Sequence, residues 1–228
     1  MTIIIIKIVA SIVLGTLAGF GAVYVFNKMP AGWLCDYDEE PSEELKSPYI
    51  QRVKGYPWRW IYAAGFCCLL VKLSFFDVQF AAAALFACWA LLIIGLADLK
   101  YMIIPDQFVI MVALSAFGFI PFHDTIWQPV IGAAIGGGIM LITALIGKIA
   151  YKKDVMGFGD VKLFASLGLA LGVKGIVIVL IGASICSGVA AIIGLASGKY
   201  KKDDVKPFGP YICGWGIFYL FVLFPLMC

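Results

Sequence analysis

Long apolar stretches dominate this sequence and limit the folds that it can adopt. A helix needs about 20 apolar residues to cross the hydrocarbon core of a bilayer, with a range of roughly 17–25. Stretches near this length run at 3–26, 58–76, 78–98, 104–121, 127–150, 161–173, 175–196 and 209–227. The sequence therefore predicts an all-α fold, a polytopic helical membrane protein with about eight transmembrane segments.

Composition agrees with this prediction and excludes an ordinary soluble domain. Hydrophobic residues make up 63% and charged residues 14% of the chain, whereas soluble domains average about 45–50% and 25%. The net charge of only +3 gives no reason to expect nucleic acid as a partner. We expect one integral-membrane domain over 1–228. The stretch 3–26 should be a retained first span, because it is longer than the apolar core of a signal peptide and contains Lys7.

The lysines and arginines predict how the chain is oriented. If the N-terminus lies outside and the spans alternate, all 17 of these residues except Lys7, Lys72 and Lys174 fall on the inside. Membrane proteins carry this excess of positive charge in their cytoplasmic loops. The segment 27–57 then becomes a short cytoplasmic loop between the first and second spans, and both termini lie outside.

Two aspartates at span ends are the first functional candidates. Asp98 follows the apolar run 91–97, and Asp160 directly precedes an apolar stretch, both on the predicted cytoplasmic side. Ionisable residues in or near a membrane are costly, so they are functional candidates by default. The alternative is that each acid simply pairs with a nearby lysine, Lys100 or Lys162.

The residues before Asp160 read Gly-Phe-Gly, and we expect these glycines to shape the chain there. Gly157 and Gly159 permit backbone angles and close approaches that other residues resist. Directly before a helix they would form a bend whose free N–H groups favour a carboxylate. Such a bend would aim Asp160 inward and leave room for an extended substrate strand.

Two carboxylates held close together favour acid–base catalysis. One keeps a proton while the other stays charged. The charged acid can then activate a water for attack on a carbonyl, and the neutral acid can donate to the carbonyl oxygen. The single histidine, His123, is predicted on the outer side, and none of the seven cysteines forms a C-x-x-C pair. We therefore expect no metal site. A further acid, Asp106, follows a proline, and we expect it to cap the fourth span.

Taken together, these motifs resemble the two signature regions of bacterial type IV prepilin peptidases, which are GxGD intramembrane aspartic proteases. One region is Asp98 with the run Ile-Pro-Asp at 104–106, and the other is the run at 157–163. The run Pro-Phe-Gly-Pro-Tyr at 207–211 fits the final cytoplasmic loop of the family. Within that pattern Asp98 and Asp160 correspond to the catalytic pair. The resemblance further implies these substrate-binding or site-shaping residues: Gly157, Gly159, Lys162, Pro105, Asp106, Pro207, Gly209 and Pro210.

This resemblance implies an enzyme of the bacterial inner membrane that acts in type IV pilus assembly or secretion. It would remove a short basic leader from prepilins or pseudopilins at the cytoplasmic face, cutting after a glycine, without a cofactor. The apolar helix that follows the leader would stay in the lipid bilayer. We hypothesise that an acidic cluster in loop 27–57 docks the leader, and the alternative is an ordinary solvated loop. Its members are Asp36, Asp38, Glu39, Glu40, Glu43 and Glu44.

Many family members also methylate the new N-terminus with S-adenosylmethionine. Those members carry two C-x-x-C pairs in the first cytoplasmic loop and a Gly-Ser-Phe-Leu-Asn run at the end of the first span. Here the loop contains a single cysteine, Cys35, and the residues at 19–23 read Gly-Phe-Gly-Ala-Val. We expect no zinc-binding loop, and methyl transfer with S-adenosylmethionine stays open.

Two other classes of function fit the residues alone. An ion-coupled transporter would use Asp98 and Asp160 as proton carriers, as transporters with broken helices do. A non-catalytic membrane scaffold would tolerate replacement of both acids. The combined motifs favour the peptidase.

Overall fold

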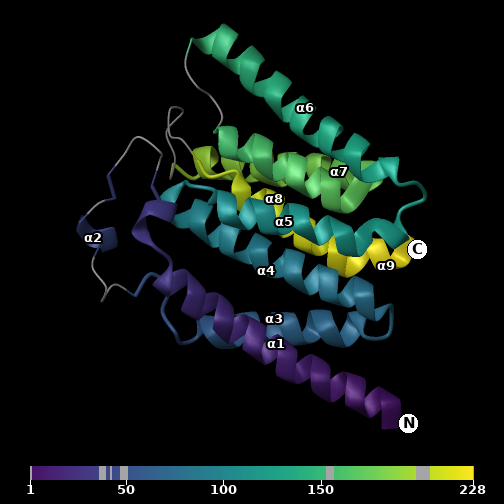
Figure 1. Cartoon of the computed structure of the whole chain (residues 1–228). Helices are drawn as coiled ribbons and strands as arrows, with labels where there is room; N and C mark the ends of the chain where they lie inside the picture. Colours follow the sequence, from purple (N-terminus) through teal and green to yellow (C-terminus); the bar gives the residue numbers. More distant parts are fainter. Residues whose placement is uncertain are drawn as a thin grey trace.

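The computed structural model describes residues 2–35, 40–41, 43–46, 51–152, 157–198 and 206–227 (Figure 1). Its α-helices are α1 (Thr2–Lys28), α2 (Glu43–Lys46), α3 (Trp58–Leu73), α4 (Val78–Tyr101), α5 (Asp106–Phe119), α6 (Trp127–Tyr151), α7 (Phe158–Ala196), α8 (Gly209–Phe218) and α9 (Phe224–Met227). Short 3₁₀ segments η1 (Ala31–Trp33) and η2 (Ile120–Phe122) and a π-helical turn η3 (Tyr219–Leu223) complete them. No strand occurs in this part of the chain. The predicted all-α fold class is confirmed.

The described helices include five that are long and apolar enough to cross a membrane. They are α1, α4, α6, α7 and the continuous apolar segment Gly209–Leu226. Helix α3 has 16 residues and α5 has 14, which is short for a full crossing. The count of about eight spans therefore stays a prediction.

Helix α7 contains both predicted stretches 161–173 and 175–196, and its direction reverses between them. Gly172 has φ 69° and ψ −172°, a backbone conformation that favours glycine. The second stretch then passes Tyr219 before Trp215, in the order opposite to that of α8 and η3. The two halves of α7 thus form an antiparallel pair, and the second half packs on α8.

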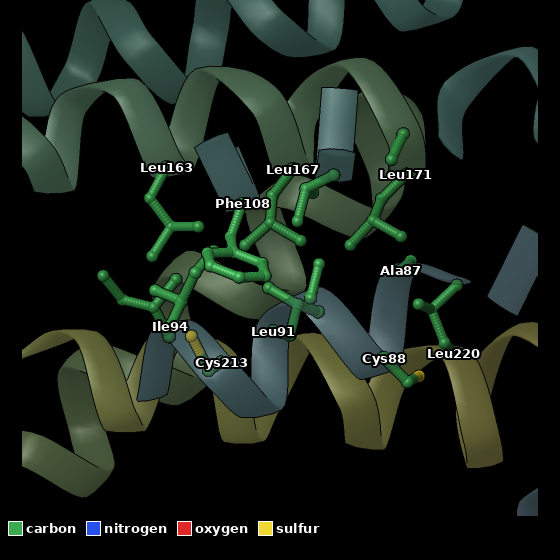
Figure 2. Packing of buried hydrophobic residues seen from close by; sticks show 14 of the residues in the cluster. Ala87, Cys88, Leu91, Ile94, Phe108, Leu163, Leu167, Leu171, Cys213 and Leu220 are labelled. Atoms are coloured by element: carbon green, nitrogen blue, oxygen red, sulfur yellow. The ribbon is translucent and has the colours of Figure 1, made fainter. Parts of the chain in front are cut away.

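Helix α4 lies at the centre of the bundle, with α3 and α1 on one side and α7 and α6 on the other (Figure 1). Twelve of its 24 residues are buried, which is typical of a helix enclosed by its neighbours. Figure 2 shows Leu91 and Ile94 of α4 pointing toward Phe108 of α5, with Leu163 and Leu167 of α7 on the far side of that ring. This core holds the ends of α4, α5 and α7 at fixed positions relative to one another.

The outer helix pairs pack through small residues. A Cβ on Gly168 of α7 would collide with the backbone of Gly132 in α6, and a Cβ on Gly19 of α1 would collide with Ala63 in α3. Close backbone contact of this kind is how helices associate in lipid, where burial of apolar surface gives little driving force.

We expect Gly168→Ala to destabilise the protein, because the added methyl forces α6 and α7 apart. Overpacking of this kind costs about 1–3 kcal/mol. The matched control is Gly138→Ala, since a Cβ at Gly138 meets nothing within 4 Å. A helical Gly→Ala change in open space gains about 1 kcal/mol of helix propensity. Thermal unfolding in detergent should therefore show a lower Tm for the first variant only, and equal Tm values would contradict the packing.

Candidate active site

Asp98 occupies the last turn of α4 and is almost enclosed, with 5% of its surface exposed. Its Oδ2 accepts a hydrogen bond of 2.8 Å from the backbone N–H of Gly209. Because Gly209 is the first residue of α8, the partly positive N-terminus of that helix lies against the carboxylate. A Cβ on Gly209 would lie 2.7 Å from the same oxygen. Only glycine allows this approach, and the contact fixes where Asp98 points.

Asp160 lies in the first turn of α7 and is half-buried. Its backbone N–H donates to the carbonyl oxygen of Gly157 at 3.2 Å. Asp160 is close enough to Asp98 for the charges of the two carboxylates to interact.

The two glycines before Asp160 differ in what they do. Gly157 has φ −69° and ψ 139°, an extended conformation that any residue adopts, and its nearest contact is 4.0 Å away. The expectation that Gly157 supplies an unusual backbone conformation is therefore wrong. A Cβ on Gly159 would lie 3.0 Å from Cβ of Ile104. Gly159 thus allows α7 to approach the turn between α4 and α5.

A cavity of about 640 Å³ contains both acids. Its walls come from the end of α4 and the turn that follows, the starts of α5 and α7, the segment before α8, and η1 with its flanks. The lining residues are Gly32, Trp33, Cys35, Pro41, Asp98, Met102, Ile103, Ile104, Pro105, Asp106, Gln107, Gly157, Phe158, Gly159, Asp160, Lys162, Lys206, Pro207 and Phe208. Two acids that are 62 residues apart in sequence thus share one solvent-accessible space.

We expected from the sequence that Asp106 caps α5, and this prediction is wrong. Pro105 is the N-cap, and Asp106 is the first residue of the helix. The carboxylate of Asp106 accepts from Nζ of Lys162 through both oxygens, at 3.0 and 2.9 Å. Asp106 lies one position after the cap, and its carboxylate pairs instead with a residue of α7.

The alternative in which lysines merely neutralise the two acids is not supported. Lys162 pairs with Asp106 across two helices. Lys100 donates to the backbone carbonyl oxygen of Arg52. Both lysines thus connect the site to neighbouring segments.

The predicted residues of the last loop come to the same place. Pro207 lines the cavity, and Gly209 and Pro210 begin α8. Proline suits the first turn of a helix, because its fixed φ is helical and its missing N–H would have no partner there. This segment brings the Gly209 amide to Asp98.

One wall of the cavity was missed by the sequence patterns. Trp33 and Cys35 line it, and the Trp33 ring packs edge-on against Phe108 with centroids 6.3 Å apart. The wall is anchored by Arg52, which is buried and donates to the carbonyl oxygens of Phe26 at 3.0 Å and Met29 at 2.6 Å. Arg52 thereby satisfies carbonyl groups that the end of α1 leaves open. A lone arginine in a polar loop gave no sequence signal for this role.

Half of the acidic cluster, namely Asp36, Asp38 and Glu39, lies outside the described residues. Glu40 is exposed and pairs with Lys46 at 3.3 Å. Glu43, also exposed, begins α2, in which Glu44 is the second residue. Docking of a leader on this cluster stays a prediction.

His123 lies far from this cavity, at the opposite end of the helices, where it follows η2. Its Nε2 is 3.2 Å from the carbonyl oxygen of Ala170. Burial lowers the pKa of His123 below its usual value, although this hydrogen bond and the neighbouring Asp124 oppose the shift. The residue cannot serve as a base for the two acids. Among the described residues, no group of three His, Cys, Asp or Glu side chains is placed to hold a metal ion.

Comparison with known proteins points to one family. Residues 85–192 match the model of the type IV leader peptidase family. That segment includes Asp98 and Asp160. The resemblance inferred from the sequence motifs is confirmed.

The curated relatives carry a common name. The prepilin leader peptidase/N-methyltransferase of Xanthomonas campestris pv. campestris is 32% identical over 63% of this chain and 51% of its own length. The protein of the same name from Aeromonas salmonicida is 32% identical over 58% of this chain and 47% of its own. The one from Bacillus subtilis is 34% identical over 56% and 50%. The chain thus spans about half the length of the curated relatives it matches, and no solved structure matches it.

The anchoring role of Arg52 can be tested through Cys35. We expect Arg52→Ala to loosen the wall around η1 and to speed modification of the Cys35 thiol by a water-soluble maleimide. Hydrogen bonds to charged groups contribute about 1.5–3 kcal/mol each, so a rise of about 10-fold is expected. The control is Lys54→Ala, with Cys35→Ser to identify the labelled site by mass spectrometry. Equal rates in Arg52→Ala and wild type would show that the wall does not depend on this arginine.

Proposed function

Because residues 85–192 match the type IV leader peptidase family, we propose that this chain is a membrane-embedded aspartic endopeptidase. Its substrates are type IV prepilins or pseudopilins, from which it removes the short basic leader after a glycine. The observation that carries the proposal is the shared cavity of Asp98 and Asp160. The cavity lies at helix ends, where water and an extended peptide can enter.

Asp98 is suited to act as the base. Its Oδ2 accepts the Gly209 N–H, and hydrogen bonds of this kind stabilise a carboxylate in its charged form. We assign to Asp98 the activation of the attacking water. Asp160 then carries the proton that stabilises the carbonyl oxygen and later helps protonate the leaving amine. No other titratable side chain is needed for these steps.

The distribution of cations supports a cytoplasmic site. Lys162 and Lys206 line the cavity, whereas Lys174 and His123 lie at the opposite end of the helices. Cytoplasmic loops of membrane proteins are the positive ones. The site would therefore lie at the cytoplasmic face of the inner membrane. There the enzyme can bind the leader while the apolar helix of the substrate stays in the bilayer.

The name of the relatives includes methyl transfer, which is not part of the function that we propose. The run at 19–23 belongs to α1 and packs on α3, with Gly19, Ala22 and Val23 buried. Phe20 stacks edge-on with Trp60 at 5.0 Å. These residues form a contact between α1 and α3, and the use of S-adenosylmethionine stays a prediction. We derive no step through that cofactor.

Proton transport by the two acids has less support. A carrier needs polar groups that lead across the bundle, and the core beyond Asp98 is lined by Leu91 and Leu167. Two of the serines buried in this bundle, Ser115 and Ser166, donate to carbonyl oxygens of their own helices at 2.6 and 2.8 Å. Such serines satisfy themselves locally and form no relay.

We expect Asp98→Asn and Asp160→Asn each to abolish cleavage of a prepilin-type substrate by the purified protein. General acid–base catalysis contributes about 10²–10⁴-fold, so each variant should lose at least about 10²-fold in kcat. Asp124→Asn is the matched control, because Asp124 is exposed at the opposite end. Thermal unfolding of each variant excludes misfolding. Cleavage by both dyad variants at the wild-type rate would rule out the carboxylate mechanism.

A second experiment tests docking of the leader. Reversing the charges of the acidic cluster should raise KM for a substrate with a basic leader by about 10-fold and leave kcat unchanged, since charge attraction acts on encounter. A substrate whose leader lysines are replaced by glutamine is the control, and for it the two enzymes should have the same KM. An unchanged KM for the basic leader would contradict docking at this cluster.

A further inference from the structure

The ion pair between Lys162 and Asp106 connects the two segments that carry the candidate catalytic acids. Asp106 begins α5, directly after the non-helical turn that follows Asp98 and α4. Lys162 lies two residues after Asp160 in the first turns of α7. The contact of 2.9 Å therefore joins the chain just beyond one acid to the chain just beyond the other.

The geometry of the pair suits a positional role. Lys162 Nζ reaches both oxygens of Asp106, at 3.0 and 2.9 Å, so the carboxylate is held in one orientation. The same Nζ lies 5.5 Å from the ring centroid of Phe158 in the first turn of α7. Both partners line the cavity that contains Asp98 and Asp160.

The pair is poorly placed to serve the stability of the whole fold. Its side chains are 33% and 32% exposed, and ion pairs near the surface contribute little to folding. Catalysis is far more sensitive to position, because a displacement of about 1 Å can cost about 10²-fold in rate. A weak bond at this location can therefore matter for chemistry while it matters little for unfolding.

We propose that Lys162 and Asp106 are positioning residues that set the separation of Asp98 and Asp160. The inference rests on the proposed peptidase function for its kinetic readout. The pair takes no part in proton transfer. It holds the start of α7 against the start of α5, and the two carboxyl groups thereby stay within reach of one water and one carbonyl.

The test is a double-mutant cycle on the purified full chain with a prepilin-type substrate. Asp106→Asn and Lys162→Gln should each lower kcat by about 10- to 100-fold with KM and Tm unchanged. The double variant should be no worse than either single one, because both remove the same contact. Lys162→Arg should retain most activity, since it keeps the charge and the pairing. Asp124→Asn, which breaks the exposed pair with Lys174 at the other end, is the matched control and should behave as wild type.

The outcomes separate positioning from its competitors. A direct effect of charge on the two acids would shift the pH profile in opposite directions, because one variant removes a negative charge and the other a positive one. Binding of substrate would raise KM and spare kcat. Either result, or additive losses in the double variant, would overturn the proposal.

A second readout does not depend on cleavage. Spin labels at Met102 and Phe158, in a background whose accessible cysteines are serine, report the separation of the two segments. We expect the distance distribution to broaden in Asp106→Asn and in Lys162→Gln and to stay narrow in Asp124→Asn. Unchanged distributions would overturn the clamp. Absence of cleavage by the wild type, with the distances responding as expected, would instead contradict the proposed function alone.

Discussion

The buried carboxylate of Asp98 is the constraint around which the helix ends are arranged. A carboxylate in apolar surroundings loses its hydration, which costs several kcal/mol unless hydrogen bonds replace the water. The Gly209 amide supplies such a bond at 2.8 Å. For that amide to reach the oxygen, position 209 must lack a side chain and α8 must begin there. The start of α8 and the end of α4 are thus fixed together.

The helices contact one another differently in the apolar part of the bundle and at the end that contains the cavity. Within the apolar part, helices associate through small residues such as Gly168 and Gly19, where lipid offers little hydrophobic gain. At the end that contains the cavity, polar contacts between chain segments take over, and Arg52 is the clearest case. The first arrangement is a rigid frame. The second is a set of adjustable contacts around a space open to water.

The sequence predicted the parts of this structure that depend on local composition. Apolar stretches identified the helices. Asp98 and Asp160 were identified as candidates because an acidic residue at the end of an apolar run can be recognised from the sequence alone. The sequence predicted separate apolar stretches at 161–173 and 175–196, and the reversal at Gly172 lies between them. One assignment failed because it needs a partner distant in sequence. Asp106 read as a helix cap, yet its partner Lys162 is 56 residues away.

The sequence did not predict the cavity wall around Trp33, because the contacts that hold this wall also join residues distant in sequence. Arg52 reaches the end of α1 from 26 residues away, and neither periodicity nor spacing marks such a contact. Gly157 failed in the opposite way, since a motif glycine suggested a special conformation that the backbone does not adopt.

Placing both acids at helix ends has a consequence for the chemistry. An acid in the middle of a span would be costly to ionise and out of reach of water. At the ends of α4 and α7, each carboxyl keeps one side toward the apolar core and the other toward the cavity. The core fixes position, and under the proposed function the cavity admits water and peptide. A hydrolytic reaction next to a bilayer needs both conditions at once, and helix ends that face a polar turn are the place in a helical bundle where both can hold.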